Sequence, residues 1–176
     1  MSTIQLESLI EKLDASCTKA LEAALSMAVS QQHASVHLAH WLYQLLMQAH
    51  DASLSALEQS GALISDLKVD LLASIESIEG GYVETPSISQ QVINTACESW
   101  LLAGLEFHQI ALTPSFVFLG LLKNTLLRQH ALQLSKGFAL VDVAVFESLI
   151  KQQEPSEPIQ ASMPSGNAML EQYTVD

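Results

Sequence analysis

Two stretches of the chain share one apolar pattern: residues 36–46 read VHLAHWLYQLL, and residues 112–122 read LTPSFVFLGLL. When one stretch is laid on the other, Leu45-Leu46 falls on Leu121-Leu122, and apolar positions fall on apolar positions between them. Self-similarity at a fixed offset is typical of an internal repeat. The sequence therefore predicts two copies of one structural unit.

The same offset, without a gap, aligns Gly61 with Gly137 and Asp66 with Asp142. Each glycine follows a short segment with helical spacing. Helices commonly end at a residue with positive φ, a conformation that glycine adopts without steric cost. We therefore expect both glycines to end helices at equivalent places in the two copies.

Apolar residues recur at helical spacing along most of the chain. Leu6, Leu9, Ile10 and Leu13, for example, follow the i, i+3, i+4, i+7 pattern of one helix face. Helices are predicted over residues 4–13, 16–30, 38–48, 53–59, 63–78, 89–107, 115–123, 126–134 and 140–150. No segment alternates between apolar and polar residues for long enough to predict a strand.

These segments predict an all-α fold, a pseudo-twofold tandem repeat of two four-helix units at residues 17–78 and 89–150, with one extra helix at 4–13. The connection 79–85 contains two adjacent glycines and is expected to be a flexible joint. Residues 151–176 contain three of the five prolines and little apolar mass, so they are predicted to be a flexible linker after a domain spanning 1–150.

Composition limits the function. The chain has 176 residues, 49% of them hydrophobic, and a net charge of −12, which is enough for one domain and argues against binding nucleic acid. Its two cysteines are too few for a disulfide framework, so a reducing, cytoplasmic setting is expected. We predict no signal peptide and no membrane span.

Three histidines, His33, His37 and His40, could form a metal site if one helix presented them together. Ser35, however, is predicted to cap the helix that holds His40, which leaves His33 in the preceding turn. No acidic or thiolate ligand stands beside them. We therefore predict buried or interfacial histidines and no metal.

Enzyme motifs are weak or absent. Two S-x-x-K strings begin at Ser16 and Ser65, but the partner motifs of serine acyl-enzymes are missing. The glycine-rich phosphate-binding motifs do not occur. Trp41 and Trp100 lie in apolar runs and are expected to pack in the core. These observations favour a helical binding module over an enzyme, with no catalytic residue and no cofactor.

Particular motifs resemble a family. The string H-W-L-x-x-L-L at His40–Leu46 and P-x-I-S at Pro86–Ser89 resemble the N-terminal domain of the Clp unfoldase ATPases. LEQYTVD at Leu170–Asp176 looks like the opening of the first ATPase domain, so the chain is expected to stop where that domain would begin. The leading helix and WLLAGLEF at Trp100–Phe107 are similar to the ClpV subfamily of type VI secretion systems.

The resemblance implies substrate recognition. ClpV N-domains bind a helix near the N-terminus of the large sheath subunit, VipB (also called TssC), so that the ATPase ring can disassemble contracted sheaths. It also implies that ATP and Mg²⁺ belong to the ATPase domain outside this chain. The resemblance further implies that this fragment is monomeric and that the full-length protein forms a hexameric ring. It also implies a cytoplasmic location.

We expect an apolar groove to hold the ligand helix, as in other helix-in-groove complexes. The leading helix would form one wall, and the start of the second repeat would form the other. The predicted wall residues are Ile4, Leu6, Leu9, Ile10 and Leu13, and Thr85, Pro86, Ile88, Ser89 and Val92. The alternative is that Leu6, Leu9 and Leu13 only cover the core of the first repeat.

Two other functions stay open. One is a general disaggregase N-domain like that of ClpB, which contacts exposed apolar segments, although the leading helix argues against it. The other is a stand-alone helical adaptor protein.

Overall fold

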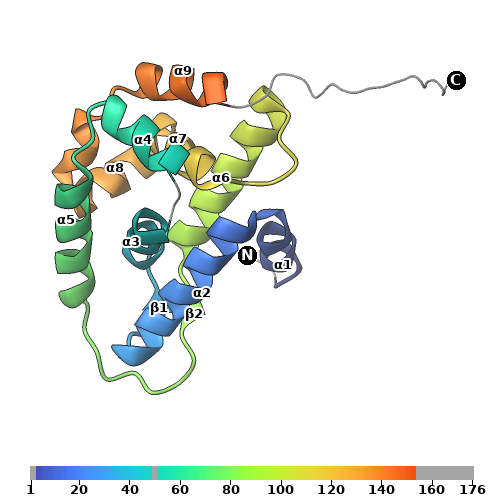
Figure 1. The fold of residues 1–176 in the computed structure, drawn as a ribbon. Coiled ribbons are helices and arrows are strands. Elements are labelled where there is room, and N and C mark those ends of the chain that lie inside the picture. The colour runs from blue at the N-terminus through green and yellow to red at the C-terminus, as the bar shows by residue number, and fades with distance from the viewer. Residues whose placement is uncertain (1–2, 49–50, 154–176) are drawn as a thin grey trace, which may run out of the picture. The chain divides into compact units, whose positions relative to one another are not determined.

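The computed structural model describes residues 3–48 and 51–153, and these are almost entirely helical (Figure 1). Its elements are α1 (Thr3–Lys12), α2 (Ala15–Ser30), β1 (Ser35–Val36), α3 (Leu38–Gln48), α4 (Asp51–Gln59), α5 (Ile64–Glu76), β2 (Ser87–Ile88), α6 (Gln90–Phe107), α7 (Pro114–Lys123), α8 (Thr125–Leu134), the 3-10 helix η1 (Lys136–Leu140) and α9 (Val143–Gln153). Each predicted helix is present, with ends that differ by a few residues. The all-α fold class is confirmed.

The first long helix of each repeat begins at a capping side chain. Asp14 caps α2, because its Oδ1 accepts a hydrogen bond from the Cys17 amide at 2.8 Å. Ser89 caps α6, and its Oγ accepts from the Val92 amide at 3.4 Å. Such caps satisfy amide groups that the helix itself leaves without partners. The first long helix of each repeat therefore begins with a side-chain N-cap.

The two caps are also the places where the repeats exchange hydrogen bonds. The Asp14 amide donates to the Leu112 carbonyl at 2.9 Å, and the Ser89 amide donates to the Val36 carbonyl at 3.1 Å. In each case the capping residue of one repeat donates to a carbonyl two positions before the second helix of the other repeat. This reciprocal pairing relates the repeats by a pseudo-twofold axis.

Short parallel pairings accompany these exchanged bonds. Val36 of β1 pairs with Ile88 of β2, and Leu13 forms an isolated parallel bridge with Leu112. Each strand has only two residues, too few for an alternating pattern to show in the sequence. The strands join the two repeats, while the helices supply the core.

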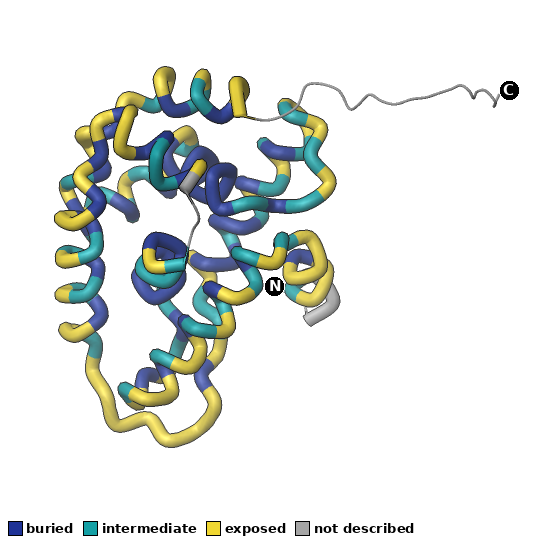
Figure 2. Tube along the Cα trace, viewed as in Figure 1, coloured by how far each residue is buried: buried dark blue, intermediate teal, exposed yellow. Residues whose placement is uncertain are grey.

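The core is built around α3 and α7, the second helix of each repeat. α7 is buried along Pro114–Leu122, and most of α3 is buried as well (Figure 2). A helix that is apolar on every side belongs in the interior. α2 packs on α3, and α6 packs on α7. On α2, the contact face consists of alanines, among them Ala20, Ala24 and Ala28, which let the helices approach closely.

One of the two expected helix-ending glycines behaves as predicted. Gly61 follows α4 and has φ of +111°, whereas Gly137 lies inside η1 without a positive φ, so that prediction was wrong. Asp142 then caps α9 through the Val145 amide at 3.2 Å, while Asp66 lies within the first turn of α5. The second repeat contains η1 as an additional element. The ungapped alignment of the two repeats therefore no longer holds at the last helix.

The connection between the repeats runs over the surface. Residues 79–85 are all exposed and form the long yellow stretch in Figure 2. The Tyr82 amide donates to the Gln32 carbonyl at 2.9 Å, and Gly81 has φ of +100°. Pro86, at the end of the connection, is buried.

The chain divides into two compact units, residues 1–146 and 147–176. The structure describes only 147–153 of the second unit, and these continue α9. The predicted linker, 151–176, lies outside the described residues except for its start. Within the described ranges, no helix has both the length and the apolar character needed to cross a membrane.

Candidate functional site

An apolar pocket lies between α1 and the N-terminal half of α6; we call it the α1–α6 pocket. Its lining residues carry no ionisable side chain: Leu6, Leu9, Ile10, Leu13, Leu21, Trp41, Ile88, Val92, Ile93 and Ala96. The enclosed volume is about 20 Å³. That is close to the space of a single water molecule. Helices α1 and α6 therefore pack together with little empty space between them.

Helix α1 lies outside both repeats and packs against α6. Leu9 faces inward and is buried, whereas Ile10 is 36% exposed at the mouth of the pocket. At the end of the helix, the Lys12 ammonium lies 5.4 Å from the centre of the Trp100 ring, a cation–π contact. The Lys12 carbonyl also accepts a hydrogen bond from the Leu112 amide at 2.6 Å. The second repeat therefore anchors the C-terminal end of α1.

The structure brings together six of the predicted groove residues and separates others. Those that line the pocket are Leu6, Leu9, Ile10, Leu13, Ile88 and Val92. Thr85 is exposed on the connection, Pro86 is buried outside the lining, and Ser89 serves as the cap of α6. Ile4 lies in α1, but its side chain is outside the described part of the structure. The binding role of all these residues stays a prediction.

Four lining residues were missed in the sequence. Ile93 and Ala96 continue the face of α6 that begins at Val92, and helical spacing could have found them. Leu21 and Trp41 come from the first repeat and reach the pocket through tertiary packing. Because they lie there beside residues of α6, α1 covers both repeats and does not merely close the core of the first.

Two of the three histidines, His33 and His40, are buried, as predicted, whereas His37 is half-buried. The Nδ1 atom of His33 lies 2.9 Å from Nε2 of His40, and the His37 amide donates to Nδ1 of His40 at 2.9 Å. Because Nδ1 of His40 accepts a hydrogen bond from the His37 amide, the hydrogen of the neutral His40 ring is on Nε2, which donates it to Nδ1 of His33. Helix α3 begins at Leu38, and Ser35 lies in β1, so the predicted cap at Ser35 was wrong.

Burial lowers the pKa of His40 to about 4, and the neighbouring His33 and His37 add to this effect. Burial likewise lowers the pKa of His37. Both shifts favour the neutral form of the ring. In the described residues, no three His, Cys, Asp or Glu side chains are arranged to hold a metal ion.

The two tryptophans differ. Trp41 is fully buried, as predicted, whereas Trp100 is only partly buried beneath Lys12, so the prediction of a core position for Trp100 was wrong. Cys17 is buried, and burial raises the pKa of its thiol, with the nearby Asp14 carboxylate adding to the shift. A thiol in such a site packs as a small apolar side chain.

The paired four-helix units and the helix added before them give this chain the fold of the Clp-type N-terminal domains. No family model matches the chain. Over 144 residues it is 29% identical to the AAA+ ATPase ClpV1 of Pseudomonas aeruginosa, an alignment that covers 81% of this chain and 16% of that protein. The chain thus spans about a sixth of the length of that curated relative.

Solved structures agree with this resemblance. The N-domain of ClpV from Vibrio cholerae is 28% identical, with a TM-score of 0.72 over 84% of this chain and 87% of that one. A solved structure described under the coevolution of the ATPase ClpV, the TssB-TssC sheath and the accessory HsiE protein is 25% identical. Its TM-score is 0.79, over 90% of this chain and 98% of that one. A ClpV N-domain in complex with a VipB peptide is 25% identical, with a TM-score of 0.60 over 82% of this chain and 92% of that one. In sequence and in fold, this chain resembles the N-domain of ClpV.

Proposed function

We propose that this chain is the substrate-recognition domain of a ClpV-like unfoldase and binds the N-terminal helix of the large sheath subunit, VipB or TssC. The observation that carries the proposal is the α1–α6 pocket, whose lining is apolar and comes from α1 and both repeats. A ClpV N-domain of the same fold forms a complex with a VipB peptide.

The lining suits the apolar face of an amphipathic helix. Such ligands insert side chains at i, i+3, i+4 and i+7 into a hydrophobic groove. The present pocket is too small for those side chains, since its volume is about 20 Å³. We infer that the ligand helix either lies across the mouth beside Ile10 or shifts α1 away from α6.

A small groove implies weak binding by one domain, because stable interfaces bury a larger area. Several N-domains on one ring would bind one sheath together, and the second contact would form at high effective concentration. The proposal therefore extends to a hexameric ATPase ring in the cytoplasm that disassembles contracted sheaths. ATP and Mg²⁺ would bind its ATPase domains, and this domain would bind its ligand without catalysis or cofactor.

The test is a titration of the domain with a peptide from the N-terminal region of the sheath subunit and with a scrambled peptide of the same composition. Ile10→Asp should abolish binding of the native peptide, because Ile10 is at the mouth of the pocket and partly exposed. Val69→Asp on α5 is the matched control, since Val69 is exposed and lies outside the lining.

Selective binding of the native peptide, lost in Ile10→Asp and kept in Val69→Asp, would support the proposal. Equal binding of both peptides would instead indicate a ClpB-like domain that contacts apolar segments in general. Binding of neither peptide would point to a stand-alone adaptor protein with a different partner.

A further inference from the structure

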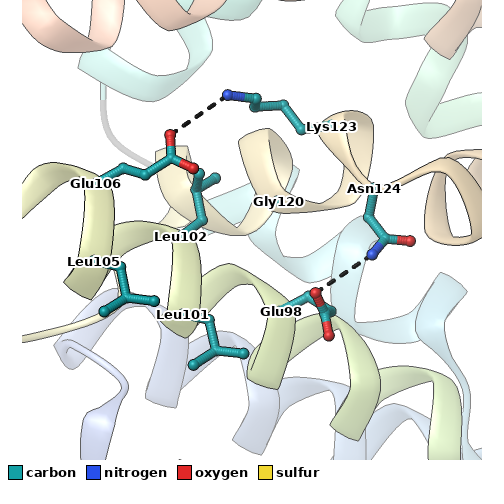
Figure 3. Close-up of a pocket in the computed structure, with 8 residues that line it drawn as sticks. All are labelled: Glu98, Leu101, Leu102, Leu105, Glu106, Gly120, Lys123 and Asn124. Carbon is teal, nitrogen blue, oxygen red and sulfur yellow. Dashed lines mark hydrogen bonds and ion pairs between the residues drawn. The ribbon is translucent and has the colours of Figure 1, made fainter.

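A second concave surface lies on the other half of α6, between α6 and α7; we call it the α6–α7 hollow (Figure 3). Its volume is about 320 Å³. Leu101, Leu102 and Leu105 contribute its apolar surface. Its charged groups are the carboxylates of Glu98 and Glu106 and the ammonium of Lys123. It shares no residue with the α1–α6 pocket. Whatever binds there is independent of the proposed sheath recognition.

A glycine beside the hollow allows α7 to lie directly against α6. Gly120 of α7 lines it, and a Cβ atom built on Gly120 would collide with the Ser99 side chain and approach Ser99 Cα to 2.7 Å. In the first repeat the equivalent residue is Gln44, whose amide reaches across to Met27 Sδ at 3.7 Å. The same place in the second repeat has no side chain from α7.

The leucines of the hollow are exposed to solvent. Leu101 is 46% exposed and Leu105 is 74% exposed, although both belong to a helix with a well-buried opposite face. Single exposed leucines are common on protein surfaces. Here, however, they lie one turn apart and line one hollow together with Leu102. Apolar surface grouped in a concavity is typical of a binding site.

Two carboxylates and one ammonium group line the hollow. Glu98 and Glu106 are two turns apart on α6, about 12 Å along the helix axis. Glu98 accepts a hydrogen bond from the side-chain amide of Asn124 at 3.4 Å (Figure 3). Glu106 forms an ion pair with Lys123 at 3.7 Å, and the Glu106 side chain is 56% exposed. The leucines lie between the two carboxylates along α6. Because Lys123 already pairs with Glu106, a complementary ligand is apolar where it covers the leucines and basic at the end that faces Glu98.

We propose that the α6–α7 hollow is a docking site for a basic amphipathic helix of a partner protein. Its apolar side chains would cover Leu101 and Leu105. A lysine or arginine side chain at one end of the ligand helix would pair with Glu98. The net charge of −12 would also draw such a segment toward the domain.

The probe is a synthetic helical peptide with leucines at i, i+3, i+4 and i+7 and with lysines at one end of that stripe. Its binding is followed by amide chemical shifts of the labelled domain. Any basic peptide is attracted to an acidic protein, so a scrambled peptide of identical composition is the control. We expect saturable shifts in α6 and α7 with the amphipathic peptide alone.

Point variants distinguish binding in the hollow from general attraction to the negatively charged protein. Leu105→Ser should weaken binding about tenfold, because it removes apolar surface that the ligand would bury. Glu98→Lys should weaken it about fivefold by replacing attraction with repulsion. The control is Glu22→Lys, since Glu22 is exposed on α2 at the equivalent repeat position and the change in net charge is the same.

Loss of affinity in Leu105→Ser and Glu98→Lys, with Glu22→Lys near the wild-type value, would support the proposal. Three results would overturn it: equal losses in Glu98→Lys and Glu22→Lys, equal binding of the scrambled peptide, or shifts confined to α1 and the α1–α6 pocket.

Discussion

Helices α2 and α6 hold the same place in the two repeats, yet only α6 borders both concave surfaces described above. On α2, Leu21 reaches the α1–α6 pocket, while Leu25 and Val29 are exposed. Gln44 of α3 donates a hydrogen bond to Met27 Sδ of α2 at the position that corresponds to Gly120. On α6, one half packs under α1, and the other half faces Gly120. A duplicated fold has thus become asymmetric through one added helix and one glycine.

The largest effect is expected where α7 crosses α6. Gly120→Ala should lower the free energy of unfolding by roughly 3 kcal/mol, because the new Cβ would overpack a fully buried contact with Ser99. Gly104→Ala on α6 is the control. Its Cβ would meet Trp100 at 3.9 Å, an ordinary contact, and should stabilise the helix by about 0.5 kcal/mol. Urea unfolding of both variants measures the difference; equal effects would contradict the role given to Gly120.

The added helix provides the next comparison. Leu9→Arg should cost roughly 2 kcal/mol of stability, since Leu9 is buried against α6 and its apolar surface would be lost. The same change should abolish binding of the sheath peptide. Leu25→Arg on α2 should change stability by less than about 0.5 kcal/mol, because Leu25 is already exposed. Thermal and urea unfolding test both; an unchanged Leu9→Arg variant would show that α1 is not held by this face.

The repeats should also differ in their response to acid. His40 is neutral in the folded protein because its pKa is lowered to about 4, whereas the unfolded chain has the ordinary value of 6.5. The unfolded state therefore binds more protons between these values, and stability falls as pH drops from 6.5 toward 4, by at most about 1.4 kcal/mol per pH unit for one proton.

The equivalent residue in the second repeat is Phe116, which is also buried. His40→Phe should therefore reduce the slope of stability against pH in this range. Unfolding curves at several pH values measure the slopes, and an equal slope in wild type and His40→Phe would exclude His40 as the source.

The smallest difference is expected at the two caps. Asp14→Ala should cost about 1 kcal/mol, the usual value for removing a capping side chain. Ser89→Ala should cost less, because its bond to the helix is 3.4 Å long, compared with 2.8 Å for Asp14. The backbone bonds to Leu112 and Val36 remain in both variants. Denaturant midpoints rank the two, and a larger loss for Ser89→Ala would reverse the comparison.

Much of the fold could be predicted from local patterns. Helical spacing located the helices, because a face that must be buried repeats with the period of the helix itself. The alignment of 36–46 with 112–122 identified the repeat, and the leading helix was separated from it. Gly137 was misjudged, since the additional 3-10 helix leaves no trace in hydrophobic periodicity. Ser35 was misjudged because a two-residue strand competes there with a helix cap.

The candidate site was predictable only along each helix. Leu9, Ile10 and Val92 follow from the amphipathic faces of the helices that carry them. Leu21 and Trp41 do not, because their place beside α1 depends on how two repeats pack rather than on spacing within one element.

By itself, the sequence determined the all-α class, the helix positions and the duplication, since these depend on contacts between residues close in the chain. Tertiary structure alone decided the exchange of bonds between the caps and the opposite repeat, the closure of α1 over α6 and the hollow beside Gly120. These features depend on the distance between helices that are far apart in sequence. That distance is set by the packing of whole side chains, which no local pattern of polar and apolar residues specifies.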